Sequence, residues 1–356
     1  MDFTFSTDQQ GLKTLAQKAF ADKRTADPEA AWAELARAGL LGVALPADHG
    51  GSGLGVIELC LVLEQAGRAA TPAALAPVLA GAAAVAQFGT PSLQAQLLPG
   101  VISGEQLITL ALHEVGGEPE HPATRAVRDG SGWKLDGVKI AVPALERSTT
   151  VIVPARLPDG TTGLFLISPN AAGVRRDQET TTDDLTLHQL TLSGVHAGDA
   201  EQLAPNRGDA ALAWLLDRVT ISLCAFELGL AQKQLEMTAE HAVRRKQFGK
   251  PIGTFQAVAQ RAADMHIDVE SLRLTVWQAA FFLAEERPAV AQLATAAFWA
   301  AEAGPRVAVA AQHIHGGIGF DRGYPLYRYF LAAKRLELEL GGANRQLARL
   351  GVALAQ

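Results

Sequence analysis

One short basic run in the chain could bind phosphate. Arg244, Arg245 and Lys246 are followed by Gln247 and Phe248, and then by a loop rich in glycine and proline. A guanidinium offers a planar fork of donors that matches phosphate oxygens, and a phenyl face offers an apolar wall. Alternatively, the cations oppose the negative end of a helix dipole. On charge alone this alternative is favoured, because cations are common in the last turn of a helix.

A second stretch combines histidine with glycine. It reads His313-Ile314-His315-Gly316-Gly317-Ile318-Gly319-Phe320. Residues without a Cβ let the backbone approach a bulky ligand, so Gly316 and Gly317 are candidate ligand contacts. Two histidines without a neighbouring carboxylate do not make a metal site. We therefore predict no metal here and expect His313 and His315 to pack at a helix end.

Helical segments must position both stretches. The basic run ends a segment with helical spacing of apolar residues, and Thr254 then begins another, where its hydroxyl could cap free backbone N–H groups. Long segments of this kind predict a helical bundle in the C-terminal part of the chain. The expected segments are Leu212 to Arg244, Thr254 to Glu285, Val290 to His315 and Tyr327 to Leu350.

In the remainder of the chain, the spacing of apolar residues changes from one region to the next. Residues 5–106 have helical spacing, whereas from about residue 107 to 204 short alternating or β-branched runs are separated by glycine, proline and aspartate. These runs leave no room for crossover helices, which predicts antiparallel strands. The expected strands are Gly132 to Val142, Thr149 to Ala155, Gly163 to Ser168 and Leu185 to Leu192. We predict a helical domain at 1–106, a β domain at 107–205 and a helical bundle at 206–356.

Composition excludes several classes of protein. With 356 residues, of which 48% are hydrophobic and 19% charged, the chain can bury a large core. A formal net charge of −6 argues against a nucleic-acid partner. Cys60 and Cys224 lie in apolar helical stretches and are expected to be buried thiols. The first six residues lack the basic and apolar runs of a signal peptide, and no apolar stretch could span a membrane, so we expect a cytoplasmic protein.

The wording of the basic run resembles the signature of a known family. The run from Arg245 to Ile252, with Phe255-Gln256 and Ala263-Asp264-Met265 after it, is similar to the signature of the flavin-dependent acyl-CoA dehydrogenases. The stretch ending at Phe320 looks like the Gly-Gly-x-Gly-Phe turn of that family, which usually has Gln where His313 stands. This resemblance covers essentially the full length. It implies an α+β fold with an N-terminal helical domain, a middle antiparallel β domain and a C-terminal four-helix bundle.

The resemblance also implies a cofactor and partners. In this family the basic segment reaches across a subunit interface, so Arg245, Gln247 and Phe248 are expected to hold the adenosine and pyrophosphate end of a neighbouring subunit's FAD. The other expected cofactor contacts are His313, Gly316, Gly317 and Asn344. The implied substrate is an acyl-CoA thioester, and the implied electron acceptor is electron-transferring flavoprotein. The chain is expected to form a homo-oligomer or to assemble with a paralogous subunit as a heterotetramer.

The implied reaction needs a base, because a carboxylate removes the α-proton of the thioester while the β-hydrogen leaves as hydride to the flavin. The positions at which relatives carry this carboxylate correspond to Leu340 and Val219, and neither side chain can take a proton. Glu339 is adjacent, but consecutive helical residues point about 100° apart, so an ion-paired or solvated role is preferred for it. Asp217 lies about 200° around a helix from Val219. It could serve only if the register slips, and a surface ion pair beside Arg218 is its plainer role.

The stretches that would contact the flavin ring depart from the family as well. Relatives have a Thr-Glu-Pro-x-x-Gly-Ser-Asp loop and a Trp-Ile-Thr step, whose Thr groups hydrogen-bond the ring. The matching stretches here are His113 to Glu120 and Ala141-Val142-Pro143. Ala141 removes the indole wall, and Pro143 supplies neither a hydroxyl nor an N–H. The chain's own ring site is therefore predicted to be lost.

Three hypotheses follow from this pattern. The first is a non-catalytic, flavin-supporting subunit of a heteromeric acyl-CoA dehydrogenase, since the run Leu340-Gly341-Gly342 resembles base-lacking subunits that act on bulky substrates such as steroid side-chain thioesters. The second is a homo-oligomeric enzyme with Asp217 or Glu339 as an irregular base. The third is a flavin-free acyl-CoA binding protein on the same fold. The first is favoured, because the segments that serve a neighbour are kept while the base and the ring-side segments are lost.

Overall fold

A computed structural model of the chain describes residues 4–21, 28–71, 74–183 and 185–355. Residues 1–3 lie outside this description. They are part of the N-terminal stretch on which the expectation of a cytoplasmic location was based. None of the helices described is long and apolar enough to cross a membrane. The chain divides into two compact units. One comprises Met1–Ala26, Gly55–Ala73 and Thr220–Gln356, and the other comprises Asp27–Leu54 and Ala74–Val219.

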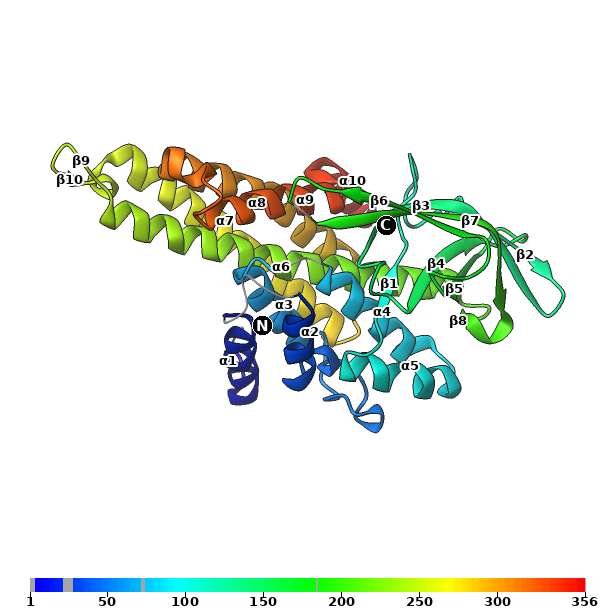
Figure 1. Cartoon of the computed structure of the whole chain (residues 1–356). Helices are drawn as coiled ribbons and strands as arrows, with labels where there is room; N and C mark the ends of the chain where they lie inside the picture. Colours follow the sequence, from blue (N-terminus) through cyan, green and yellow to red (C-terminus); the bar gives the residue numbers. More distant parts are fainter. Residues whose placement is uncertain (1–3, 22–27, 72–73, 184, 356) are drawn as a thin grey trace. The chain divides into compact units, whose positions relative to one another are not determined.

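The first unit is helical (Figure 1). Its helices are α1 (Thr7–Ala21), α3 (Val56–Arg68), α7 (Gln256–Ala284), α8 (Val290–His315), α9 (Leu326–Glu339) and α10 (Gly342–Leu354). Helix α6 (Gly208–Arg244) begins in the second unit and continues into the first without a break. Helix α8 packs against α7, α9 and α10. Helices α3 and α6 approach closely, since a Cβ added at Gly229 would lie 1.9 Å from the carbonyl oxygen of Glu64.

The predicted C-terminal helices are confirmed, with one correction. The last expected segment, Tyr327 to Leu350, is not one helix but two, because α9 ends at Glu339 and α10 begins at Gly342. Gly341 and Gly342 have φ angles of 79° and 77°. These values lie in the left-handed region, which ends a right-handed helix and which glycine adopts without steric cost. The break lies directly after Leu340, one of the two positions at which relatives carry the base.

The second unit combines helices with a sheet. Its helices are α2 (Pro28–Arg37), α4 (Leu75–Phe88) and α5 (Pro91–Ser103). Its strands are β1 (Ile108–Leu110), β2 (Arg125–Asp129), β3 (Gly132–Pro143), β4 (Thr150–Arg156), β5 (Thr162–Ile167), β6 (Val174–Thr180), β7 (Thr186–Gly198) and β8 (Gln202–Leu203). They form one sheet in the order β6-β7-β3-β2-β4-β5-β8, with β1 paired to β4. The predicted domain limits at residues 106 and 205 stay a prediction.

Most strand pairs are antiparallel, as predicted, but two are parallel. Strand β1 pairs with β4 in parallel, and β2 meets β4 in parallel through Arg125 and Arg156. The prediction assumed that a parallel pair needs a crossover helix. Here the β2–β3 hairpin lies between β1 and β4 in the chain and makes the return instead.

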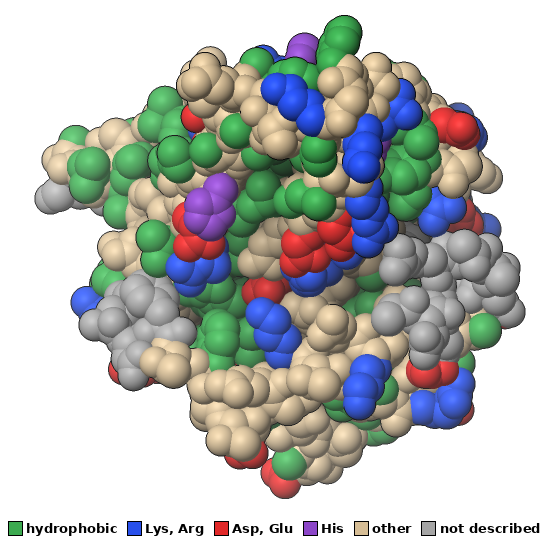
Figure 2. Space-filling model, turned by 90° about the vertical axis from the view of Figure 1, so that its left-hand side faces the viewer, with side chains coloured by type: hydrophobic (Ala, Val, Ile, Leu, Met, Phe, Trp, Pro, Cys, Tyr) green, Lys and Arg blue, Asp and Glu red, His purple; other side chains and the backbone are tan. Residues whose placement is uncertain are grey.

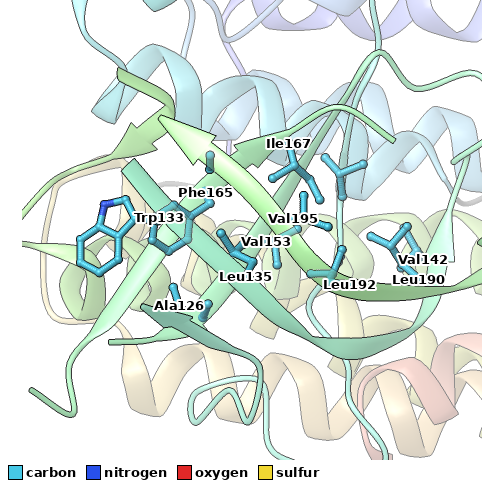
Figure 3. Packing of buried hydrophobic residues seen from close by; sticks show 14 of the residues in the cluster. Ala126, Trp133, Leu135, Val142, Val153, Phe165, Ile167, Leu190, Leu192 and Val195 are labelled. Carbon is cyan, nitrogen blue, oxygen red and sulfur yellow. The ribbon is translucent and has the colours of Figure 1, made fainter. Parts of the chain in front are cut away.

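The core of the sheet lies on the face shown in Figure 3. It is built from alternate residues of β3, β4, β5 and β7, whose side chains point to one side of the sheet. The centre includes Trp133, Leu135, Val153, Phe165, Leu192 and Val195. The rings of Trp133 and Phe165 lie 5.6 Å apart between centroids. Cys60 and Cys224, each buried in a helix, are free thiols as predicted.

Candidate functional site

The basic run forms a projecting hairpin, which we call the basic arm (residues 244–255). Helix α6 ends at Arg244, and the short strands β9 (Lys246–Gln247) and β10 (Lys250–Pro251) then pair antiparallel. The base of the hairpin is closed by a hydrogen bond of 2.8 Å from the Ile252 N–H to the Arg245 carbonyl. Figure 2 looks onto the side where Figure 1 shows β9 and β10, and Lys and Arg side chains lie beside hydrophobic ones on this face.

The tip of the basic arm presents an aromatic ring to solvent. Phe248 and Gly249 form the two-residue turn and have φ angles of 52° and 79°. Positive φ at both central positions is the type I′ turn of tight hairpins, but it is unfavourable for a bulky residue such as Phe. The Phe248 side chain is 93% exposed. A strained, exposed aromatic residue on a loop is typical of a binding surface.

Phe255, the last residue of the basic arm, packs against two residues of the hairpin. Its ring lies 6.2 Å from the Phe248 ring at an interplanar angle of 87°, and the Lys250 ammonium lies 4.6 Å from its centroid. The predicted cap at Thr254 is wrong. A 3₁₀ turn, η4 (Ile252–Thr254), precedes α7, and the Thr254 hydroxyl donates to the Pro251 carbonyl within that turn at 2.8 Å. Helix α7 therefore begins after Phe255 without a side-chain cap.

The three arm residues predicted to contact a cofactor are all exposed. Arg245 and Gln247 lie on the hairpin close to Phe248, and the Gln247 side chain donates a hydrogen bond of 2.8 Å to the adjacent Lys246 carbonyl. Phosphate oxygens would therefore meet a guanidinium fork, an amide and a phenyl ring on one segment. This donor set fits the adenosine and diphosphate end of a dinucleotide.

The glycine turn (residues 315–320) follows α8 as the 3₁₀ turn η5 (Gly316–Phe320). Gly316 and Gly317 are exposed, and a Cβ added at either would have no heavy atom within 4 Å. The backbone is thus open to a ligand, as predicted. Gly319 differs, because its added Cβ would lie 2.3 Å from the Gln312 side-chain oxygen, so this glycine is required for packing.

The two histidines beside this turn have different surroundings. His315 packs at the helix end as predicted. Its Nδ1 lies 2.8 Å from the Ala311 carbonyl oxygen and its Nε2 lies 3.1 Å from the Tyr324 hydroxyl. The same prediction is wrong for His313, which is exposed, because it lies on the solvent side of the last turn of α8. Asn344 is also exposed, in the first turn of α10.

Neither usual base position can supply a proton acceptor. Leu340 is 5% exposed and ends the α9 segment, and its carbonyl accepts a hydrogen bond from the Gln346 side chain. Glu339 is ion-paired as predicted, with the Arg335 guanidinium 2.6 Å from its carboxylate. Val219 is buried in α6, which is α-helical throughout, so the register slip that Asp217 would need does not occur. The arrangement contains no carboxylate in either family position.

The ring-side stretch uses its polar groups internally. We call residues 113–124 the Glu114 loop, because the Glu114 carboxylate closes it. That carboxylate accepts hydrogen bonds from the Thr124 N–H at 2.9 Å, the Thr124 hydroxyl at 2.6 Å and the Lys139 ammonium at 2.6 Å. Burial raises the pKa of Glu114, but the bonds to Lys139 and Thr124 outweigh it and bring the pKa to about 2. Burial lowers the pKa of Lys139, which is 0% exposed, while Glu114 opposes that change.

No side-chain donor is left for a flavin ring at residues 139–144 of the described chain. Lys139 has the sole polar side chain of that stretch, and Glu114 occupies it. Ala141 has a φ of 53° and lies in a bulge of β3, where a small side chain points to no partner group. The Pro143 carbonyl already accepts the Thr109 hydroxyl at 2.6 Å. The ring end of a flavin therefore does not fit these residues, whereas its adenosine end fits the basic arm.

A buried acid was missed by the sequence reasoning. Glu227, in the part of α6 that belongs to the first unit, is 0% exposed, and neither of its carboxylate oxygens has a hydrogen-bond partner in the described chain. Burial raises its pKa well above the usual value, against the charge of Arg335. A glutamate within the apolar run of residues 223–231 was the signal that could have revealed it. No group of three or more His, Cys, Asp or Glu among the described residues could hold a metal ion.

Comparison with known proteins matches two stretches of the chain to family models. Residues 9–105 match the acyl-CoA dehydrogenase N-terminal domain, and residues 206–354 match the acyl-CoA dehydrogenase C-terminal domain. Acyl-CoA dehydrogenase FadE27 of Mycobacterium tuberculosis is 41% identical over 335 residues, which cover 91% of this chain and 88% of that protein.

Two solved structures with similar folds are heteromeric by name. The ChsE4-ChsE5 complex from Mycobacterium tuberculosis matches with a TM-score of 0.94 and 38% identity, over 100% of this chain and 99% of the matched chain. The Tcur3481-Tcur3483 steroid ACAD G363A variant matches with a TM-score of 0.91 and 41% identity, over 98% of each chain. Each likeness spans nearly the whole chain.

Proposed function

The chain belongs to the acyl-CoA dehydrogenase family, and on that premise we propose that it is the non-catalytic, flavin-supporting subunit of a heteromeric, FAD-dependent acyl-CoA dehydrogenase. Its partner is a paralogous subunit that carries the base and the ring pocket. The observation that carries the proposal is a contrast within one chain. The basic arm presents Arg245, Gln247 and Phe248 to solvent, whereas both base positions and the ring-side stretch lack the groups that chemistry would need.

Two arm residues have defined tasks in this proposal. The Arg245 guanidinium binds diphosphate oxygens of the partner's FAD, and the Phe248 ring lies against the adenosine. Gly316 and Gly317 let the backbone of the glycine turn approach the diphosphate, and His313 and Asn344 are the further proposed contacts. When bound, FAD would supply the acceptor for the hydride that leaves the β-carbon of the thioester. The proton from the α-carbon goes to a carboxylate of the partner, because Leu340 and Val219 cannot accept it.

The substrate class follows from the relatives. One similar structure is named as a steroid acyl-CoA dehydrogenase, so we propose a bulky acyl-CoA thioester, such as one with a steroid side chain, as the substrate of the complex. Electron-transferring flavoprotein is the proposed acceptor, and the cytoplasm is the proposed location. The complex is a heterotetramer in which each basic arm reaches a flavin of a neighbouring subunit.

Co-expression tests the proposal. The full chain is produced alone and together with a family member that has glutamate at the position of Leu340 or Val219, and both preparations are assayed for flavin absorbance and acyl-CoA oxidation. We expect a yellow, active complex only from the co-expression. An active, flavin-loaded preparation of this chain alone would contradict it.

Two variants test the alternative that the chain supplies its own base. In the active complex, Asp217→Asn and Glu339→Gln should leave turnover unchanged within about twofold, since Glu339 is paired with Arg335 and Asp217 lies out of register with Val219 on a continuous helix. A loss of about a hundredfold in kcat on either substitution would assign the base to this chain and would refute the non-catalytic role.

A further inference from the structure

A stacked pair of imidazoles joins the basic arm to the glycine turn. His241 lies in the last turn of α6, directly before the arm, and His315 is the last residue of α8, directly before Gly316. Their ring centroids are 4.3 Å apart and the ring planes are inclined by 24°. The pair is thus a contact between the helix end that leads into the basic arm and the helix end that leads into the glycine turn.

His315 is held as a neutral ring. The Ala311 carbonyl oxygen can only accept, so Nδ1 of His315 carries the proton and donates to it at 2.8 Å. Nε2 is then free to accept from the Tyr324 hydroxyl at 3.1 Å. A second proton on Nε2 would require the Tyr324 hydroxyl to turn and accept, and it would place a charge on a residue that is 6% exposed. Burial lowers the pKa of His315 in the same sense, although the bond to Ala311 opposes it.

His241 is therefore the member of the pair that can take up a proton. It is half-buried, and its carbonyl accepts a hydrogen bond of 2.8 Å from the N–H of Arg245, the residue after α6. The titratable and charged groups that act on it are His315, the last residue of α8, and Arg245, which follows α6. Tyr324 lies beside His315, and Glu240 and Arg244 act on that hydroxyl. Burial lowers the pKa of His241 from its usual 6.5, and the positive charge of Arg245 adds to this lowering.

We propose that His241 is a positioning residue for the bound nucleotide, whose stack on His315 fixes the arm against the glycine turn and which takes up a proton when a diphosphate binds at Arg245. This rests on the proposed function above. A diphosphate neutralises the arm cations that disfavour a second charge on His241. Because linkage is reciprocal, a proton on His241 must then strengthen diphosphate binding.

The sign of the pH dependence follows. Anion binding raises the pKa of His241 from its depressed value in the free site. Affinity for the diphosphate is therefore highest below the free-site pKa and falls as pH rises through the bound-state pKa. A single nearby charge at the protein surface should change affinity by about threefold to tenfold across this window.

The test uses the co-expressed complex after removal of its flavin. FAD is titrated back at a series of pH values from about 5.5 to about 8, a range chosen to bracket histidine titration, and binding is followed by flavin fluorescence. His241→Phe keeps a ring for the stack but cannot titrate, His241→Ala removes the stack, and His196→Asn is the control for loss of an exposed histidine elsewhere.

We expect the wild type and His196→Asn to bind FAD more weakly as pH rises, by about threefold to tenfold. His241→Phe should bind with wild-type affinity near pH 8 but without the pH dependence. His241→Ala should bind more weakly at every pH. Wild-type pH dependence in His241→Phe would overturn the inference while leaving the proposed function intact. A complex that holds no FAD at any pH would instead refute the proposed function, and the inference with it.

Discussion

The basic arm and the Glu114 loop use their polar groups in opposite ways. In the arm, Arg245, Gln247 and Phe248 face solvent and the backbone at Phe248 is strained. In the loop, the Glu114 carboxylate is bound by Thr124 and Lys139, and the pair is enclosed. The first region keeps binding groups at a cost in stability, and the second turns equivalent groups into internal support. Substitutions in the Glu114 loop should therefore lower stability, whereas substitutions in the basic arm should weaken binding.

The largest effect is expected in the loop. Glu114→Gln leaves Lys139 buried beside a neutral partner, which should lower the free energy of unfolding by about 3–5 kcal/mol. Chemical denaturation of the full chain measures it. Glu179→Gln, on the exposed strand β6, is the control and should stay within about 0.5 kcal/mol. An unfolding free energy for Glu114→Gln equal to that of the control would show that the pair contributes nothing.

The same carboxylate gives a pH prediction. Because its folded-state pKa is depressed to about 2, its stabilising contribution is present above the unfolded value of 4.5 and is lost as pH falls towards 2. The wild type should lose more stability than Glu114→Gln across this acid range. Denaturation series at matched pH values measure the difference. Parallel curves for the two proteins would mean that Glu114 does not titrate as stated.

The next effect is expected in the arm and concerns binding alone. Arg245→Ala should weaken FAD retention by the complex about 10-fold to 100-fold, the cost of losing a charge-assisted contact of about 1.5–3 kcal/mol. Its unfolding free energy should stay within about 0.5 kcal/mol of the wild type, since Arg245 is exposed. Arg261→Ala on α7 is the matched control for loss of an exposed cation. Equal flavin retention in both variants would remove Arg245 from the site.

The buried Glu227 of α6 should make the stability of the helical unit depend on pH. Its pKa is raised by burial, so its favourable contribution is full below 4.5 and declines as pH rises towards the folded-state pKa. The wild type should lose up to about 1.4 kcal/mol per pH unit relative to Glu227→Gln over that interval. Thermal or chemical unfolding at several pH values measures the slope. Identical slopes in both proteins would contradict a protonated Glu227.

The smallest effect is expected at the tip of the arm. Phe248→Gly removes the strain of a left-handed phenylalanine and should raise the unfolding free energy by up to about 1 kcal/mol. The same change removes the exposed ring and should weaken FAD retention by the complex. Unfolding and fluorescence titration are measured on the same variant. A change of the same sign in both would contradict the division between binding and stability.

The sequence predicted the parts of the fold that depend on long apolar periods. Helices α6, α7 and α8 were expected nearly as they are, because each presents an apolar face over many turns. The exposed strand β6, whose residues are mostly charged or polar, was missed, as was the short strand β1. A polar strand at the edge of a sheet has no alternating apolar face, so its pairing depends on neighbours that are distant in sequence.

The candidate site could be predicted only in part. The wording of the run at Arg245 identified the arm, but its strained hairpin and the stack of His241 on His315 arise from tertiary contacts. His313 shows why the rest could not be predicted. It lies two residues before His315 and is exposed because it lies on the solvent side of the helix, whereas His315 is buried. Lys139 shows another case, because a lysine in an alternating strand is expected to face solvent unless its partner is known. That partner, Glu114, lies 25 residues earlier in the chain.

The exposed ring of Phe248 also has a consequence for how the chain is made. A ring that is 93% exposed at a hairpin tip would be covered, in the proposed heteromer, only after assembly. Until then the exposed ring is a hydrophobic site through which newly synthesised chains can self-associate. Chain made in excess of its partner should therefore accumulate as aggregates rather than as a spare pool of subunits. Balanced supply of the two chains, and not only their affinity, then sets how much enzyme a cell contains.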